Sequence, residues 1–137
     1  MKAKEILNDL KLNTFCRLKL SKIHGVGVFA IRPIPKGKNP FESSRTYKLT
    51  KIPIEKIKKL RPALKRYVLD FCAVRDGFVL VPIFGINQID IAHYLNHSKN
   101  SNLDAQIQTN GDTEFYTKSA IKTGVELTVD YSLFSEF

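Results

Sequence analysis

Three short segments of the sequence combine residue types that could bind a ligand or support group transfer. The first is His24-Gly25-Val26-Gly27, whose two glycines allow a positive φ and a close approach of a ligand to the backbone. The second, His93-Tyr94-Leu95-Asn96-His97-Ser98, holds two imidazoles and an amide. The third runs from Gly124 to Tyr131 and is predicted to end a strand on a tyrosine. Each segment alone also fits an ordinary turn, loop or strand.

The second segment has more than one chemical interpretation. As a His-x-x-x-His pair, His93 and His97 could lie on one helix face and bind zinc, but the adjacent glutamate and a third ligand are missing. The segment also fits the end of a helix that runs into an Asn-rich loop. In a further interpretation, the Asn96 amide and the backbone at His97 hold a polar ligand. No metal site is expected.

Composition and charge limit the classes of protein to which this chain can belong. The chain has 137 residues and a net charge of +9, which fits a single small domain with one core. Only Cys16 and Cys72 occur, so a disulfide scaffold or a cysteine-built zinc site is not expected. No apolar run is long enough to cross a bilayer and the first residues do not resemble a secretion signal. We therefore expect an intracellular protein, without membrane contact.

Most of the positive charge lies in one stretch. Residues 48–66 carry eight basic side chains and one acidic side chain, a net charge of +7. Apolar residues recur at helical spacing from Ile54 to Phe71, which predicts an amphipathic helix over about 48–72 that is interrupted near Pro62. Its basic face is either a solvated surface or a surface for nucleic acid or an acidic protein.

The elements that must position the three segments are mostly strands. Alternation, apolar runs and the Asn110-Gly111 turn predict strands over 16–20, 28–31, 78–84, 105–108, 113–117 and 125–131. A short helix is predicted over 1–11. The sequence thus predicts a mostly β domain of small sheets with short helices and one helical insert.

Taken in order, these segments resemble the SET-domain protein lysine methyltransferases. The resemblance covers nearly the whole chain and rests on three sets of residues: His24 to Ala30 with Pro35-Lys36-Gly37; Tyr94 to Ser98 with Asn102; and Gly124, Glu126-Leu127-Thr128 and Asp130-Tyr131. It identifies residues 1–137 as one SET domain, with a core over about 15–132 and the basic stretch as its variable insert. The chain is similar to short stand-alone SET proteins of viruses and bacteria.

The resemblance implies a β-clip-like fold with a C-terminal knot, and S-adenosylmethionine as the cofactor. It implies that Tyr131 is catalytic and that Tyr94 and Val129 line the channel for the target lysine. The residues that it places around the cofactor are His24, Gly25, Gly27, Asn96, His97, Tyr131 and Phe134. The expected partners are a protein substrate that bears a lysine and a second copy of the chain in a homodimer.

Several family features are absent. The cysteine-rich, zinc-binding segment after Asp-Tyr is missing, so Phe134 and Phe137 or a partner chain must take its place. Lys99, Val125, His93 and Val129 stand where the family usually has Cys, Glu, Arg and an aromatic residue. The leading hypothesis is methyl transfer from S-adenosylmethionine to a lysine side chain. The alternative is an inactive or weakly active module that binds nucleic acid or an acidic protein through Lys48 to Arg66.

Overall fold

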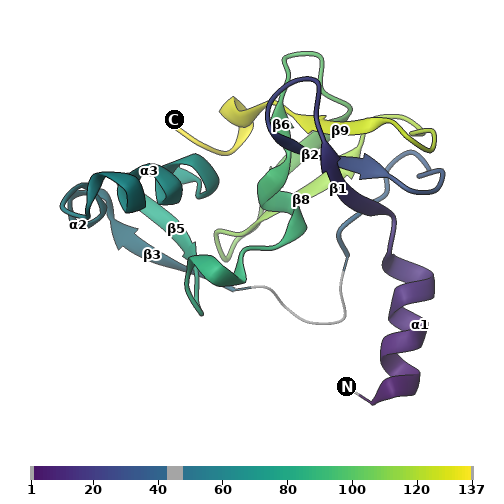
Figure 1. Ribbon diagram of the computed structural model, residues 1–137, viewed down its shortest axis with the longest axis horizontal. Helices are drawn as coiled ribbons and strands as arrows, with labels where there is room; N and C mark the ends of the chain where they lie inside the picture. Colours follow the sequence, from purple (N-terminus) through teal and green to yellow (C-terminus); the bar gives the residue numbers. More distant parts are fainter. Residues whose placement is uncertain (1, 43–47, 137) are drawn as a thin grey trace.

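The computed structural model describes residues 2–42 and 48–136, and Phe137 lies outside them. Figure 1 shows small sheets with short helices at the periphery. The α-helices are α1 (Ala3–Asn13), α2 (Ile54–Lys58) and α3 (Pro62–Phe71). The strands are β1 (Cys16–Leu20), β2 (Val26–Ala30), β3 (Leu49–Pro53), β4 (Val74–Arg75), β5 (Phe78–Pro82), β6 (Asn96–His97), β7 (Leu103–Ile107), β8 (Thr113–Thr117) and β9 (Glu126–Val129). The 3₁₀-helices of the described residues are η1 (Ile86–Gln88), η2 (Ile91–Tyr94) and η3 (Tyr131–Leu133).

The larger sheet collects strands from both ends of the chain. Its order is β1-β2-β9-β7-β8, and β6 also pairs with β9. β9 is antiparallel to β2 and runs parallel to β6 and β7. The predicted last strand therefore lies in the middle of the sheet, where it pairs with the strand of the glycine pair and with the strand of Asn96. This topology brings together three segments that are far apart in the sequence.

The smaller sheet and two helices form the insert, which we define as residues 48–82. Its strand order is β3-β5-β4, and α2 and α3 follow β3. The prediction of one helix from residue 48 is wrong for its first part, because 49–53 form β3. Every residue of β3 has a partner in β5, from Leu49 opposite Pro82 to Pro53 opposite Phe78, and this tertiary pairing decides the conformation. The interruption of the helix near Pro62 is confirmed.

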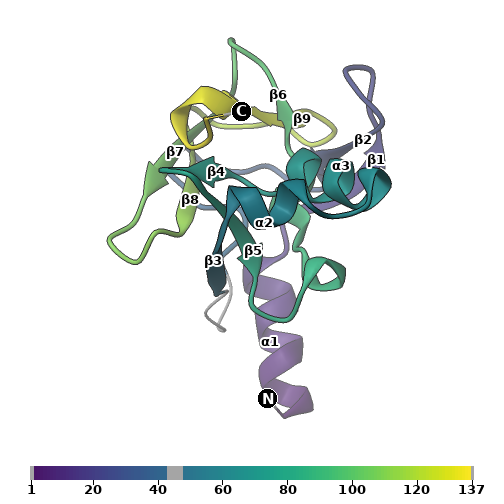
Figure 2. The same cartoon turned by 90° about the vertical axis from the view of Figure 1, so that its left-hand side faces the viewer.

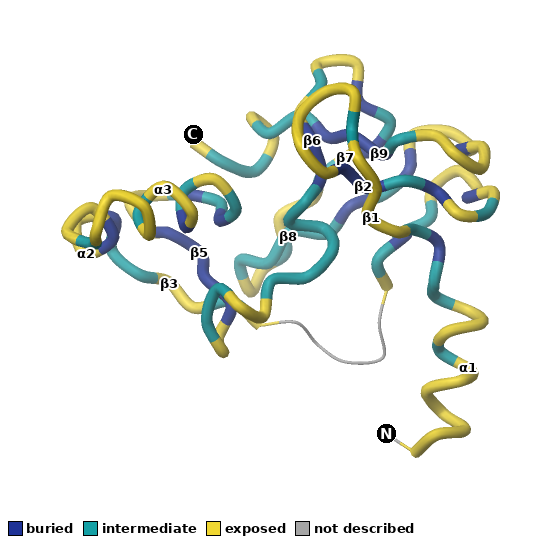
Figure 3. Tube along the Cα trace, viewed as in Figure 1, coloured by how far each residue is buried: buried dark blue, intermediate teal, exposed yellow. Residues whose placement is uncertain are grey.

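Each of the two parts has an apolar cluster of its own, and Figure 3 colours the chain by how far each residue is buried. The cluster of the larger sheet includes Val28, Leu103, Leu127 and Val129, which have no measurable exposure. The cluster of the insert is built from Ile54, Ile57, Val68, Cys72, Val74, Val79 and Val81. The apolar stripe predicted for the basic helix does face a core, and that core is the insert's own.

The N-terminal helix lies outside both clusters. Figure 2 shows α1 extending away from the sheets, and none of its residues is buried. Arg32 holds its C-terminal end by donating to the carbonyl oxygens of Lys11 and Leu12, at 2.9 and 3.0 Å. In the described ranges, no helix has both the length and the apolar character needed to cross a bilayer.

Candidate functional site

Asn96 connects the three segments that the sequence singles out. It lies on β6, is only 6% exposed and pairs in register with Thr128 of β9. Its side-chain nitrogen donates to the carbonyl oxygen of His24 at 3.0 Å and to a carboxylate oxygen of Glu126 at 2.9 Å. Ser21 also donates to that carboxylate, at 2.8 and 3.0 Å to its two oxygens. The buried amide thereby fixes the loop before β2 against β9.

The two glycines of the first segment have different roles. A β-carbon at Gly27 would lie 2.2 Å from a carboxylate oxygen of Glu126 and 3.1 Å from the side-chain nitrogen of Asn96. Only glycine therefore leaves Glu126 in this position. Gly25 has a φ of +45°, and a β-carbon there would meet nothing within 4 Å. The loop at Gly25 is thus open to a ligand, while Gly27 packs against the network below it.

His97 positions the tyrosine. The backbone N–H of Tyr131 donates to Nδ1 of His97 at 3.0 Å, and the two rings lie 5.1 Å apart between centroids. Because Nδ1 accepts this bond, the imidazole holds its proton on Nε2 in this arrangement. Asp130 caps η3 by accepting from the N–H of Ser132 at 3.0 Å, which ends β9 and turns the chain at Tyr131. His97 therefore holds the backbone of Tyr131 in place.

The Tyr131 side chain reaches the backbone of the residue that precedes β6. Its hydroxyl donates to the carbonyl oxygen of Leu95 at 2.5 Å, and burial raises its pKa above the usual value near 10. The ring packs edge-on against Phe134 at 6.0 Å, and Phe134 packs against Phe115 at 5.5 Å. Tyr131 stays neutral at physiological pH, with lone pairs on the hydroxyl oxygen available to accept a hydrogen bond.

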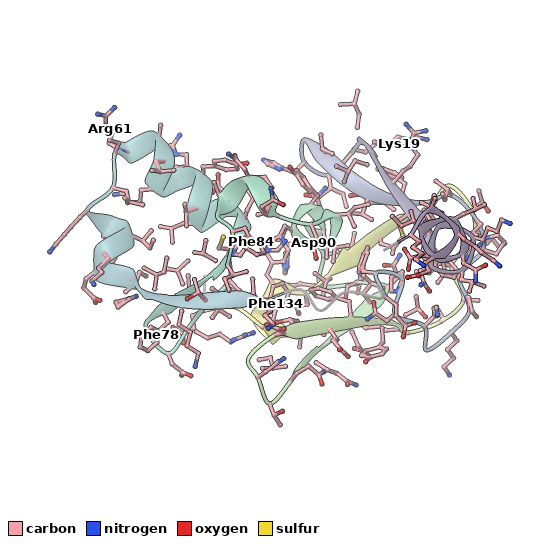
Figure 4. All side chains as sticks on the ribbon, turned by 90° about the horizontal axis from the view of Figure 1, so that it is seen from below. Lys19, Arg61, Phe78, Phe84, Asp90 and Phe134 are labelled. Carbon is pink, nitrogen blue, oxygen red and sulfur yellow. The ribbon has the colours of Figure 1, made fainter. Side chains whose placement is uncertain are left out.

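A groove of about 1,680 Å³ runs between the insert and β8 and includes Leu95, Tyr131 and Phe134 in its lining. Phe84, Asp90 and Phe134 all belong to this lining and are labelled in Figure 4, which views the molecule from below. Among the described residues, the charged side chains that line this groove are the carboxylates of Glu42, Asp70, Asp90, Asp112 and Glu114 and the ammonium groups of Lys38 and Lys48. These described side chains carry a net negative charge, although the whole chain is strongly basic.

The remaining predicted residues are placed as follows. Tyr94 packs its ring against Phe71 of α3 at 5.2 Å, where the insert meets the larger sheet. Val129 is fully buried in the core instead of lining a channel, because its position on β9 faces the apolar cluster. Phe134 lies on the groove side of Tyr131, and His24 is exposed on the open loop.

The two histidines of the second segment do not share a helix face. His93 belongs to η2 and pairs with Asp90 at 2.8 Å, whereas His97 lies on β6. The 3₁₀-helix ends at Tyr94, which separates the two rings. Within the part of the chain that the structure describes, no three His, Cys, Asp or Glu side chains form a group that could hold a metal ion.

Three residues outside the predicted site support its geometry. Asn102 donates to the carbonyl oxygen of Glu126 at 2.9 Å and accepts from the N–H of Thr128 at 2.8 Å. Its side chain thus replaces a strand partner along β9. Glu126 and Ser21 complete the network around Asn96. Asn102 and Glu126 belong to the motifs of the sequence, but their function as supports follows only from the pairing of strands that they contact.

Comparisons with known proteins agree with this arrangement. The search of curated protein sequences found no match. The structure matches 223 solved chains, among them the crystal structure of a candidate histone methyltransferase from Plasmodium falciparum. That match has a TM-score of 0.58 at 18% identity and covers 88% of this chain and 95% of the other, which shows the fold. The family model of the SET domain matches residues 25–132. The chain therefore belongs to the SET-domain family, the methyltransferase family that its motifs resemble.

Proposed function

We propose that this protein transfers a methyl group from S-adenosylmethionine to the side-chain amine of a lysine in a protein substrate. The observation that carries the proposal is the position of Tyr131. Its backbone is held by His97, beside the Asn96 network, while its hydroxyl lies at Leu95 in the lining of the groove. Tyr131 therefore lies between the Asn96 network, where we propose that the cofactor binds, and the groove, where we propose that the substrate binds.

The residues around the open loop fit the polar cofactor. No described residue donates to the side-chain oxygen of Asn96, so this oxygen is available to an ammonium group, and the loop at Gly25 is open. We place the cofactor against the backbone of 24–27, Asn96 and His97. When bound, S-adenosylmethionine supplies a methyl group on a sulfonium that is activated for displacement. His24 is an exposed side chain of this loop and would contact the cofactor from outside.

The protein's own task is alignment, because methyl transfer is an in-line displacement. The amine nitrogen of the lysine forms a bond to the methyl carbon as the sulfur–carbon bond breaks, and the nitrogen loses a proton to water. Tyr131 donates to Leu95 and so offers only acceptor lone pairs to the amine and the methyl group. Since burial raises the pKa of its hydroxyl, Tyr131 orients the amine and does not remove its proton as a phenolate.

The lysine must enter as a neutral amine, although its pKa is about 10.4 in water. The end of the groove near Tyr131 is lined by Leu95, Phe115 and Phe134. Such an apolar site disfavours the ammonium form and lowers the pKa of the bound lysine. Asn96, Ser21 and Glu126 are not part of this lining, so their polar groups do not compensate for the loss of solvation. Desolvation by the aromatic residues is therefore part of the proposed mechanism.

The charge of the groove favours a lysine in a basic segment. From the sequence alone, the basic insert would be expected to repel such a segment if its charged face formed the groove wall. Instead, Asp70 of the insert and Asp90, which precedes η2, line the groove, and no lysine or arginine of α2 or α3 lines it. Figure 4 shows Arg61 at the far end of the insert, away from Phe134. Opposite charge then guides a basic peptide into the groove.

Labelled S-adenosylmethionine and two sets of lysine peptides, with basic or with acidic flanking residues, test the proposal. We expect methyl incorporation into lysine and a higher rate for the basic set. The Tyr131→Phe variant should lose about 100-fold or more in kcat, because it removes a positioned hydroxyl from the transition state. A Tyr67→Phe variant, altered on the exposed side of α3, is the matched control. Methylation by Tyr131→Phe at the wild-type rate would refute the mechanism.

A second candidate function rests on the outer face of the insert. Its basic side chains between 48 and 66 take part in no ion pair among the described residues. Such a face is suited to nucleic-acid phosphates, with or without methyl transfer. Neutralising Lys58, Lys59, Lys65 and Arg66 should then abolish salt-dependent binding to a DNA duplex. Unchanged binding by this variant would exclude the candidate.

A further inference from the structure

The end of the chain crosses from the larger sheet to the insert, and one arginine lies at the crossing. Arg75 belongs to β4, within the insert. One guanidinium nitrogen donates to the hydroxyl of Thr113 at 2.9 Å and to the carbonyl oxygen of Phe134 at 3.1 Å, and the other donates to the carbonyl oxygen of Gly111. A single side chain therefore joins the insert, the β7–β8 turn and the C-terminal segment.

The C-terminal segment continues along β4 after this contact. The N–H of Glu136 donates to the carbonyl oxygen of Val74 at 2.8 Å, and the N–H of Val74 donates to the hydroxyl of Ser135 at 3.1 Å. The carboxylate of Glu136 accepts from the N–H of Asp76 at 2.5 Å, in the turn that leads to β5. Residues 134–136 thus satisfy backbone groups at the edge of the smaller sheet, which an edge strand otherwise leaves open.

We propose that Arg75 is a positioning residue, and that together with residues 134–136 it forms a clip that sets the groove and places Phe134 beside Tyr131. This inference rests on the proposed function. Phe134 contacts Tyr131 and Phe115 through its ring, while its carbonyl oxygen is held by Arg75. The same guanidinium holds the insert and β8, whose separation defines the groove.

Arginine is required for this task because its planar fork donates in several fixed directions. Lysine has the same charge but a single flexible ammonium group, which cannot hold three acceptors in the same geometry. Among the described residues, Arg75 bonds to Thr113, Phe134 and Gly111, and not to Tyr131 or the Asn96 network. The clip should therefore affect the binding of a peptide in the groove while leaving cofactor affinity unchanged.

The direct test is hydrogen exchange at the amides of Val74 and Glu136 in the full chain. We expect about tenfold faster exchange in Arg75→Met, the effect of losing hydrogen bonds from a charged donor, and an intermediate value in Arg75→Lys. Arg66→Met, on the exposed face of α3, is the control and should leave both amides unchanged. Unaltered protection in both Arg75 variants would overturn the proposal. Because Arg75→Lys retains the charge and most of the volume, it gives a result even if Arg75→Met does not fold.

Kinetics separate positioning from simple destabilisation. With the basic lysine peptides, Arg75→Lys should raise KM about tenfold and leave the Kd for S-adenosylhomocysteine near wild type. A purely structural effect would lower kcat with the folded fraction and leave KM unchanged, which would contradict the clip. Absence of transferase activity in the wild type would refute the proposed function, whereas the exchange measurement would still decide whether the clip exists.

Discussion

The region around β2, β6 and β9 differs from the insert in what holds it together. In the first, buried polar side chains satisfy specific partners, and Asn96, Asn102 and Glu126 each bond to a different segment. The insert packs an apolar cluster of its own and exposes most of the basic side chains of residues 48–66. Buried hydrogen bonds require particular residues, because an unpaired polar group is costly, whereas an exposed lysine face tolerates replacement.

This difference separates the two tasks of the molecule. The polar network fixes Tyr131 and the loop that we propose for the cofactor, and their geometry cannot vary. The insert provides one wall of the groove and an outer basic face, and the residues of that outer face can change without disturbing this geometry. Substitutions in the first region should therefore affect stability and cofactor binding, whereas those on the insert's outer face should affect only what the protein binds.

The largest effect is expected at Asn102. Replacing Asn102 with Ala leaves the carbonyl oxygen of Glu126 and the N–H of Thr128 without their partner inside the sheet. The free energy of unfolding should fall by about 2–3 kcal/mol, measured by urea denaturation. The matched control is Asn100→Ala in the exposed turn that precedes β7, which should stay near wild type. Equal free energies of unfolding for the two variants would contradict the claim that specific polar side chains hold the region around β9 together.

Gly27→Ala should weaken cofactor binding. The new β-carbon would displace the Glu126 carboxylate from Ser21 and Asn96, so we expect about a tenfold rise in Kd for S-adenosylhomocysteine. The effect should shrink when Glu126 is also replaced with Ala, because the shorter side chain leaves room for the methyl group. Additive effects of the two substitutions would show that the contact between Gly27 and Glu126 is not what matters.

The two cysteines report on the two cores, because Cys72 is buried in the cluster of the insert and Cys16 is partly buried against the cluster of the larger sheet. Burial raises the pKa of Cys16 to about 12 and that of Cys72 to about 11, so both stay protonated in the folded protein when the unfolded thiols ionise near pH 9. The unfolded state then binds fewer protons, and stability should fall as pH rises above 9, by at most about 1.4 kcal/mol per pH unit for each thiol. Denaturation between pH 8 and about 10.5 should show a shallower slope in Cys72→Ala and Cys16→Ala. An unchanged slope in both variants would contradict the pKa assignments.

The smallest effect is expected on the outer face of the insert. Changing Lys58, Lys59, Lys65 and Arg66 to Gln should alter the free energy of unfolding by less than about 0.5 kcal/mol, since these side chains have no ionic partner among the described residues. Cofactor affinity, measured by titration, should also be unchanged. A large loss of either would mean that the insert supports the catalytic region through its charges.

The sequence predicted much of the fold and most residues of the candidate site, because short motifs define them. Glycine at 27, the amide at 96 and the tyrosine at 131 each meet a local requirement, and their order along the chain identified the family. The strand over 49–53 could not be predicted, since its conformation depends on pairing with β5. The bonds from Arg75 to Gly111 and Phe134, and the negative groove assembled from separate segments, likewise depend on tertiary contacts.

The most direct test of the central claim is a calorimetric titration of the full chain with S-adenosylmethionine and S-adenosylhomocysteine. The account predicts saturable one-to-one binding by the wild type and at least about a tenfold weaker Kd for Asn96→Ala, with Asn100→Ala unchanged. Circular dichroism must first show that each variant is folded. Folded wild-type protein that binds neither compound, or an Asn96→Ala variant that binds as tightly as wild type, would contradict the proposed cofactor site.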